Sequence, residues 1–170
     1  MIVMYGKGKV GESVVALCSY MELPVTLMDD ADRDNNLLVQ AQYIVVTPGI
    51  KESHPIYSQF SEKVLSELDF LTVYKDRFSF WDNAIYIGIT GTNGKSTTSY
   101  VLDRILSRYF STRPDFMCWL GGNFSAPLSS LFLKILQDKL EEKLEEKRHI
   151  FVIESSSFML AHTHIFRYTY

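Results

Sequence analysis

The sequence predicts an α/β chain with two parallel β-sheet units in series. Short apolar runs alternate along it with segments of helical spacing, a pattern typical of parallel strands joined by crossover helices. One apolar run leads into a glycine-rich turn at 6–11, and a later run leads into a second such turn at 88–97. These two strand–turn–helix starts predict a Rossmann-like domain over residues 1–82 and an incomplete P-loop-type α/β domain over residues 83–170.

The first unit is predicted from its apolar runs and turns. Buried strands are expected at 2–5, 25–28 and 43–46. A helix at 11–21 joins the first two strands, and Thr47-Pro48-Gly49 is a turn signal that ends the third. Further elements are expected as a helix at 54–63, a short strand at 64–65 and a helix at 67–74.

Residues 76–83 are predicted to be a linker, after which a second series of strands and helices begins. Its expected elements are a strand at 84–90, a helix at 96–109, a strand near 117–119, a glycine turn at 121–123, a helix from about Pro127 and a strand at 150–153. The charged stretch 138–148 is expected to be a helix with one solvated face, because Leu133, Leu136, Leu140 and Leu144 have helical spacing.

Composition limits the class of protein. The 170 residues are 46% hydrophobic, with a net charge of −3. This composition allows a globular core and argues against non-specific nucleic-acid binding, which needs a basic surface. No apolar run is long enough to predict a transmembrane helix, and the first residues read as a strand and not as a signal peptide. Cys18 and Cys118 are expected to be free, buried thiols, which favours a cytoplasmic protein.

The most informative motif is Gly91-Thr92-Asn93-Gly94-Lys95-Ser96-Thr97, between a predicted strand and a predicted helix. Backbone N–H groups of such a turn surround phosphate oxygens, and the helix N-terminus adds partial positive charge. Lys95 supplies a full charge, and the hydroxyl of Ser96 is a ligand suited to Mg²⁺. The motif therefore predicts a nucleoside triphosphate site, although Ile89 stands where the usual P-loop template has glycine.

A second motif, Gly6-x-Gly8-x-x-Gly11, follows the first strand and opens the first helix. Asp29 lies 18 residues beyond Gly11, at the end of the second strand, where it could reach a ribose hydroxyl. The motif fits any nucleotide with a diphosphate and a ribose. Only about three clear strands precede the linker, so a nucleotide diphosphate fits better than NAD. An NAD(P)-linked oxidoreductase remains the alternative reading of this motif.

Polar residues of the second unit gather at strand ends. Glu154 closes an apolar strand, where a carboxylate would hold Mg²⁺ directly or through water. Ser155, Ser156 and Ser157 follow it, and some of these hydroxyls are expected to be helix caps. Asn123 follows another strand at the same edge and offers both a donor and an acceptor. The pair His162-x-His164 is only a weak metal-binding pattern.

Four segments, in this order, resemble the Mur ligase family. They are residues 6–11, residues 90–97, Gly121-Gly122-Asn123 and residues 154–158. Thr47-Pro48-Gly49-Ile50 followed by His54-Pro55 is most similar to the branch of the family that adds D-glutamate to UDP-N-acetylmuramoyl-L-alanine. Relatives that add L-alanine typically have His where this chain has Asn93, and folylpolyglutamate-type ligases usually have Gly where it has Ser96.

The resemblance implies an ATP- and Mg²⁺-dependent ligase of cytoplasmic peptidoglycan synthesis, acting as a monomer without nucleic acid or membrane. ATP would phosphorylate the carboxylate of the UDP-sugar, and the amine of D-glutamate would attack the acyl phosphate. The implied ATP-binding residues are Gly91, Thr92, Asn93, Gly94, Lys95, Ser96 and Thr97, with Lys95 and Glu154 catalytic and Ser96 and Glu154 binding the metal. The implied UDP-substrate residues are Gly8, Lys9, Val10, Gly11, Asp29, Asn123 and Ser156.

The chain departs from the family pattern at several positions. Lys9 stands where an apolar residue is common, Asp30-Ala31 replaces a polar–basic pair beside the uracil, and Met159 stands where Gln is usual. The family's downstream metal-binding His, its carbamylated Lys and its amino-acid-binding domain have no counterpart up to Tyr170. We therefore expect an N-terminal fragment that binds its UDP-linked ligand weakly and has no turnover alone. The alternatives are a nucleotide-binding regulatory module and another Mur or folylpolyglutamate-type ligase.

Overall fold

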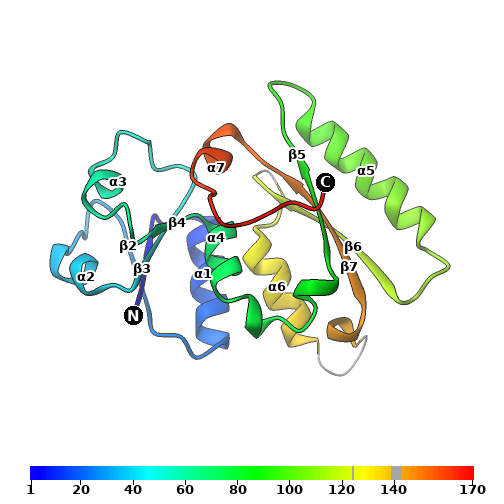
Figure 1. Ribbon diagram of the computed structural model, residues 1–170, viewed down its shortest axis with the longest axis horizontal. Coiled ribbons are helices and arrows are strands. Elements are labelled where there is room, and N and C mark those ends of the chain that lie inside the picture. Colours follow the sequence, from blue (N-terminus) through cyan, green and yellow to red (C-terminus); the bar gives the residue numbers. More distant parts are fainter. Residues whose placement is uncertain (124, 139–142) are drawn as a thin grey trace.

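The computed structural model describes residues 1–123, 125–138 and 143–170. Two parallel sheets lie on opposite sides of a central layer of helices, α1, α4 and α6 (Figure 1). The predicted fold class, α/β with parallel sheets and a Rossmann-like first unit, is confirmed. Within these described ranges, no helix is both long and apolar enough to span a bilayer.

The first unit is built on a four-stranded sheet in the order β2-β1-β3-β4. Its strands are β1 (Ile2–Tyr5), β2 (Val25–Met28), β3 (Tyr43–Val46) and β4 (Val64–Leu65). Every residue of β1 is buried, because both faces of this central strand are covered. Ile2 is in register with Val25 on one side and with Tyr43 on the other. All four strands have the bounds that the apolar runs predict.

The helices of the first unit are α1 (Lys9–Tyr20), α2 (Asn35–Gln40), α3 (Pro55–Gln59) and α4 (Glu67–Val73). Helix α1 begins two residues before the predicted start at Gly11, so Gly11 is a helical residue packed against the loop. Helix α2 begins inside a polar stretch, 29–36, for which no helix was predicted, and the side chain of Asp34 caps its first N–H groups. Helix α3 is shorter than the prediction of 54–63, because the chain leaves helical geometry at Phe60.

The predicted linker is not a free connection. It contains two 3₁₀ turns, Lys75–Arg77 and Trp81–Asn83, and the rings of Phe78 and Phe80 are buried. Both rings pack edge-on against Phe132 of the second unit, with centroids 4.8 and 4.9 Å apart. Aromatic burial therefore fixes this segment against the core.

The second unit has a three-stranded parallel sheet in the order β5-β7-β6. Its elements are β5 (Ile85–Ile89), α5 (Lys95–Tyr109), β6 (Phe116–Gly122), α6 (Leu128–Gln137), β7 (Arg148–Glu154) and α7 (Ser157–Ala161). Gly121 and Gly122, predicted as a turn, are instead the last residues of β6. The segment 168–170 runs along β5, where the amide of Gly88 donates to the carbonyl of Tyr170.

The charged stretch 138–148 was predicted to be helical, and its described part is not α-helical. Helix α6 ends at Gln137, Leu144–Glu146 form a 3₁₀ turn, and Arg148 already begins β7. Leu144 is buried, so it serves the core. Leu140 lies outside the described residues.

One apolar core joins the two units. Helix α1 packs against α6 (Figure 1), and their side chains belong to the same buried cluster. Two hydrogen bonds accompany this packing, between the hydroxyls of Ser13 and Ser129 at 2.9 Å and from the hydroxyl of Tyr20 to the carbonyl of Leu136 at 2.8 Å. The packing brings the loop after β1 close to the end of β6.

Candidate functional site

The loop between β5 and α5 has the backbone geometry that its glycines predict. Gly94 precedes the first helical residue with φ of 78°, a left-handed conformation that favours glycine. Among the residues that the structure describes, no side chain caps the N-terminus of α5 or accepts from its first N–H groups. The ammonium of Lys95 folds back and donates to the carbonyl of Gly91 at 2.7 Å. The arrangement is an uncapped helix start with a cation beside it.

Glu154 lies at the carboxyl end of the second unit's sheet, on its middle strand. It is only 2% exposed, ends the middle strand β7, and is in register with Ile89 on one side and Gly122 on the other. The hydroxyl of Ser96 donates to its Oε1 at 3.1 Å. Gly122 has φ of 108°, and a Cβ there would lie 2.2 Å from the carbonyl oxygen of Glu154, so this approach requires glycine.

The pair Ser96–Glu154 has the chemistry of a Mg²⁺ site. Hydroxyl and carboxylate oxygens are the ligands that this cation prefers, and it commonly uses few protein ligands, with phosphate and water completing the shell. Among the described residues, no cluster of three or more His, Cys, Asp or Glu side chains forms a metal site of its own. The two oxygens therefore fit a cation that arrives with a phosphate group, and they do not form a closed metal cage.

A cavity of about 590 Å³ lies against this loop, which we call the second pocket. Its lining residues are Thr90, Gly91, Thr92, Lys95, Asn123, Ser156, Ser157 and Phe158. Of the predicted ATP-binding residues, Gly91, Thr92 and Lys95 line it, while Asn93, Gly94, Ser96 and Thr97 belong to the same loop and helix start without lining it. The hydroxyl of Ser156 accepts from the amide of Met159 and caps α7, as expected for one of the three serines.

A cavity of about 290 Å³ lies between the two units, which we call the first pocket. The first unit contributes Lys7, Gly8, Lys9, Val10, Thr47, Pro48, Gly49 and Glu67, and the second unit contributes Gly122, Asn123 and Met159. Asn123 also lines the second pocket, so the two cavities meet at this side chain. The predicted residues Gly8, Lys9, Val10 and Asn123 therefore lie together.

Gly11, Asp29 and Ser156 were also predicted to bind the UDP-substrate, but none of them lines the first pocket, and Ser156 lines the second. Gly11 is buried, and a Cβ on it would meet the carbonyl oxygen of Gly6 at 2.3 Å, so its role is close packing of helix and loop. Asp29 does not line the first pocket. Its carboxylate is 3.2 Å from the ammonium of Lys7, which does line it, and it accepts the amide of Ala31.

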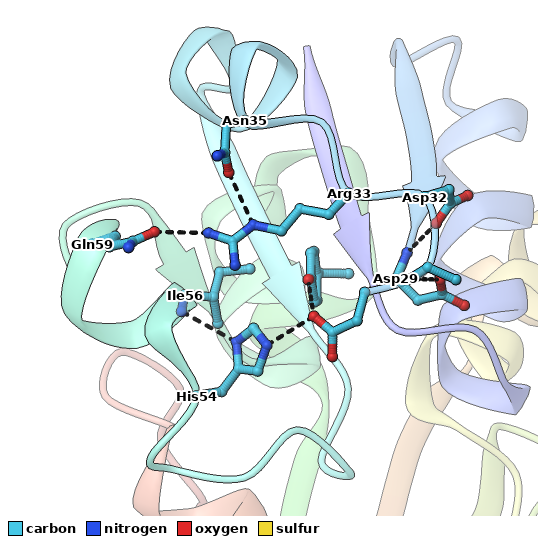
Figure 2. Close-up of polar contacts among 10 residues, drawn as sticks. Asp29, Asp32, Arg33, Asn35, His54, Ile56 and Gln59 are labelled. Atoms are coloured by element: carbon cyan, nitrogen blue, oxygen red, sulfur yellow. Dashed lines mark hydrogen bonds and ion pairs between the residues drawn. The ribbon is translucent and has the colours of Figure 1, made fainter.

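Asp29 and Asp32 form an acidic loop that pairs with Lys7. Figure 2 shows how the two aspartates lie. Asp32 accepts the amide of Asp29 at 2.7 Å and pairs with the ammonium of Lys7 at 3.0 Å. The backbone hydrogen bond from Asp29, followed by the contact with Lys7, lowers the pKa of Asp32 to about 2. The positive charge of Lys7 is therefore held by two carboxylates next to the first pocket.

Asp30 belongs to a neighbouring polar cluster. Asp30 accepts hydrogen bonds from the hydroxyl of Tyr5 at 2.5 Å and from Nε2 of His54 at 2.9 Å. Nδ1 of His54 accepts the amide of Ile56, which assigns the ring proton to Nε2 (Figure 2). The hydrogen bond from Tyr5, and then that from His54, lowers the pKa of Asp30.

Some residues that line the first pocket were not predicted as site residues from the sequence. Lys7 lay inside the glycine motif, but its pairing with two carboxylates depends on the conformation of the later loop. Glu67 is 6% exposed and was assigned only to a helix. A signal existed beside it, because Ser66-x-x-Asp69 is a helix-start pattern, and the hydroxyl of Ser66 accepts the amide of Asp69 at 3.0 Å.

Comparison with known proteins gives a consistent result. No protein-family model matches the chain. A UDP-N-acetylmuramoylalanine–D-glutamate ligase of Helicobacter pylori (strain J99) is 33% identical over 123 residues, which are 72% of this chain and 24% of that protein. Ligases of the same name from Cytophaga hutchinsonii and Aquifex aeolicus are 32% and 29% identical, covering 76% and 91% of this chain and 25% and 33% of their own lengths.

The chain thus spans about a quarter to a third of the length of these curated relatives. Their similarity agrees with the resemblance of the glycine loops, the Gly-Gly-Asn segment and the Glu-Ser-Ser-Ser-Phe segment. The strand–loop–helix geometry around Lys95 and Glu154 is the local structure that these motifs imply. The chain therefore belongs to the Mur ligase family, and over the stretch that it spans its similarity is to members that are named D-glutamate ligases.

Proposed function

We propose that this chain supplies the UDP-sugar site and the ATP site of a ligase that adds D-glutamate to UDP-N-acetylmuramoyl-L-alanine in peptidoglycan synthesis. The observation that carries the proposal is the position of Asn123, which lines both pockets. A ligase that joins a phosphoryl donor to a carboxylate needs its two ligands to end at one place. The names of the curated relatives support the choice of substrates.

The first pocket has the chemistry for a nucleoside diphosphate. Gly8 precedes α1, and no side chain in the described part of the chain caps this helix, so the N–H groups at the start of its 12 residues are available to an anion. Lys7 and Lys9 add positive charge at the same pocket, and the two walls come from both units. The diphosphate would lie on Gly8, Lys9 and Val10, with the uridine toward the loop that contains Asp29.

The second pocket has the chemistry for ATP. The uncapped start of α5 and the ammonium of Lys95 would neutralise the β- and γ-phosphates. Ser96 and Glu154 would hold Mg²⁺, which supplies charge neutralisation for the phosphoryl group when bound. Phosphoryl transfer between two anions depends on alignment and charge neutralisation more than on covalent help from the protein.

The proposed reaction then has two steps. The substrate carboxylate, held near Asn123 and Ser156, attacks the γ-phosphorus of ATP, giving an acyl phosphate and ADP. The amine of D-glutamate attacks the acyl carbon, and inorganic phosphate leaves from the tetrahedral intermediate as the amide forms. Within this scheme Asn123 and Ser156 orient the sugar and alanine, and Lys95 stabilises the negative charge on the transferred group.

Binding measurements on the 170-residue chain test the proposal directly. Calorimetric titration should detect UDP-N-acetylmuramoyl-L-alanine and, separately, ATP with Mg²⁺. Lys95→Ala should weaken ATP binding by roughly 100-fold, because the side chain meets the phosphates, while the thermal midpoint stays unchanged. Lys75→Ala, at an exposed lysine of a 3₁₀ turn, is the matched control and should bind ATP normally.

Two results would contradict the proposal. One is NADH binding with no response to the UDP-sugar, which would favour the oxidoreductase reading of residues 6–11. The other is ATP binding that Lys95→Ala leaves intact, which would remove the second pocket from the mechanism.

A further inference from the structure

The first turn of α4 carries three buried polar side chains that all bond to the second unit. Ser66, Glu67 and Asp69 are 5%, 6% and 1% exposed, and we call them the α4 turn. Buried polar groups of this kind are costly unless each is satisfied. Their partners come from two separate places in the second unit: the start of α6 and the segment 163–166, which follows α7.

Glu67 caps a helix of the other unit. Its Oε1 accepts from the backbone amide of Ser129 at 2.8 Å and from the hydroxyl of Ser129 at 2.6 Å. Helix α6 begins after Pro127, which offers no side-chain cap of its own. The carboxylate of Glu67 therefore satisfies the start of α6 from outside that helix.

Asp69 binds the backbone that follows α7. Its Oδ2 accepts the amide of His164 at 2.7 Å, and its Oδ1 accepts the amides of Ile165 and Phe166, both at 2.8 Å. A nearby hydrogen bond runs from the hydroxyl of Thr163 to that of Ser66 at 3.1 Å. One buried carboxylate thus holds three successive N–H groups of the second unit against the first.

The α4 turn lies beside the first pocket, and none of its three residues lines the second. Glu67 is one of the residues that line the first pocket, whose walls come from both units. Every residue that lines the second pocket belongs to the second unit. The packing of α1 on α6 also joins the units, but it does so along the length of these two helices, whereas the α4 turn joins them at the pocket itself.

We infer that Asp69, together with Ser66, is a positioning residue for the ligand of the first pocket. It holds the two walls of that pocket at their working separation, so that the ligand binds to a site already formed. The identity of this ligand as a UDP-sugar rests on the proposed function. Because the second pocket lies within one unit, loss of Asp69 should weaken binding at the first pocket and leave ATP binding at the second unchanged.

The test is Asp69→Asn in the whole 170-residue chain. The substitution keeps the size of the side chain but turns an NH₂ group toward one of the three amides. The Kd for UDP-N-acetylmuramoyl-L-alanine should rise about tenfold, while the Kd for ATP with Mg²⁺ stays within about twofold. Asp76→Asn, at an exposed aspartate of a 3₁₀ turn, makes the same chemical change and should alter neither constant.

Hydrogen exchange provides a readout that needs no ligand. The amides of residues 164–166 should exchange roughly tenfold faster in Asp69→Asn than in the wild type, with α5 unaffected. Thr163→Val is a milder second variant that removes the hydroxyl bonded to Ser66 and should weaken UDP-sugar binding about threefold.

The outcomes separate this inference from the proposed function. Equal weakening of both ligands in Asp69→Asn, or no weakening of either, would overturn the positioning role. If the wild type binds no UDP-sugar, the proposed function fails, and unchanged exchange at 164–166 in the variant would then overturn the positioning role as well.

Discussion

The loop before α1 and the loop before α5 differ in how the protein holds them. Gly11 is packed against Gly6, and α1 buries Gly11, Val14, Leu17 and Cys18 between the sheets. Helix α5 buries only Ser99, while Tyr100, Ile105 and Tyr109 remain more than half exposed. The conformation of the first loop is therefore fixed by packing against the core. The conformation of the second loop depends on its own backbone hydrogen bonds and on its ligand.

The lysines of the two loops differ in the same sense. Lys7 is paired with Asp29 and Asp32, so an anion in the first pocket must compete with two carboxylates for it. Lys95 donates to a carbonyl of its own loop, a neutral partner that a phosphate would replace easily. The comparison predicts that the first site is rigid and that Lys7 contributes little to anion binding there. It predicts that ligand binding at the second site depends strongly on Lys95.

The largest expected effect concerns the packing of the first loop. Gly11→Ala should lower the free energy of unfolding by about 3 kcal/mol, because its Cβ would meet the carbonyl of Gly6. Gly91→Ala has room for the Cβ, whose nearest atom is 3.7 Å away, and should cost about 1 kcal/mol from its φ of 142°. Urea denaturation of both variants measures the difference. Equal losses would show that the two loops are equally packed.

The next effect tests whether only the second loop uses a metal. Glu154→Gln should reduce the affinity for ATP about tenfold in Mg²⁺ and have little effect when EDTA removes the metal. Binding of the UDP-sugar should not change in either condition. Glu52→Gln, at an exposed position, serves as the control. A Mg²⁺-independent loss in Glu154→Gln would mean that the carboxylate acts on the nucleotide by another route.

A smaller effect of pH should arise in the second unit. Burial lowers the pKa of His149, whose Nδ1 accepts the indole N–H of Trp119 at 2.7 Å. The unfolded chain binds this proton near pH 6.5, and the folded chain binds it only at lower pH, so stability should fall as pH decreases below 6.5. Urea midpoints, followed by tryptophan fluorescence, should show this loss in the wild type and not in His149→Gln. A loss of equal size in both would assign it to other groups.

The smallest effect concerns Lys7. Lys7→Ala should leave the free energy of unfolding nearly unchanged, because its ion pairs are half exposed and screened by water. The affinity for the UDP-sugar should fall about threefold, less than the loss of ATP affinity in Lys95→Ala. Urea denaturation measures the free energy of unfolding, and ligand titrations at low and high salt measure the affinity for the UDP-sugar. If Lys7→Ala weakened its ligand as much as Lys95→Ala weakens ATP, the contrast between the two lysines would be wrong.

Local patterns predicted much of this fold. The strands at 2–5 and 43–46 have the predicted bounds, because parallel strands buried on both faces are continuous apolar runs. The half-buried edge strand at 25–28 also has its predicted bounds. The start of α5 was equally clear, since the residues that shape the turn are consecutive. Helix α2 was missed because its polar sequence hides a capped start at Asp34. Phe78 and Phe80 looked like linker residues because their partner, Phe132, comes some 50 positions later.

The candidate site shows the same limit. Residues that act through a local motif, such as Lys95 and Ser96, could be predicted from their spacing. Glu67 and Asp69 could not, because their roles come from bonds to Ser129 and to residues 164–166 across the boundary between the units. Asp29 was predicted to bind the ligand because it lies 18 residues after Gly11 in the sequence. In the structure it contacts Lys7, which lines the first pocket, and this contact depends on the fold of the acidic loop. Its role in binding the uridine stays a prediction.

The common core beneath α1 and α6 has a practical consequence for anyone who wishes to divide this protein. A cut near residue 82 would leave Phe78 and Phe80 on one fragment and Phe132 on the other. Each fragment would then expose a large apolar surface to water. Either half, produced alone, should collect in inclusion bodies, whereas the two halves made together in one cell should reassemble.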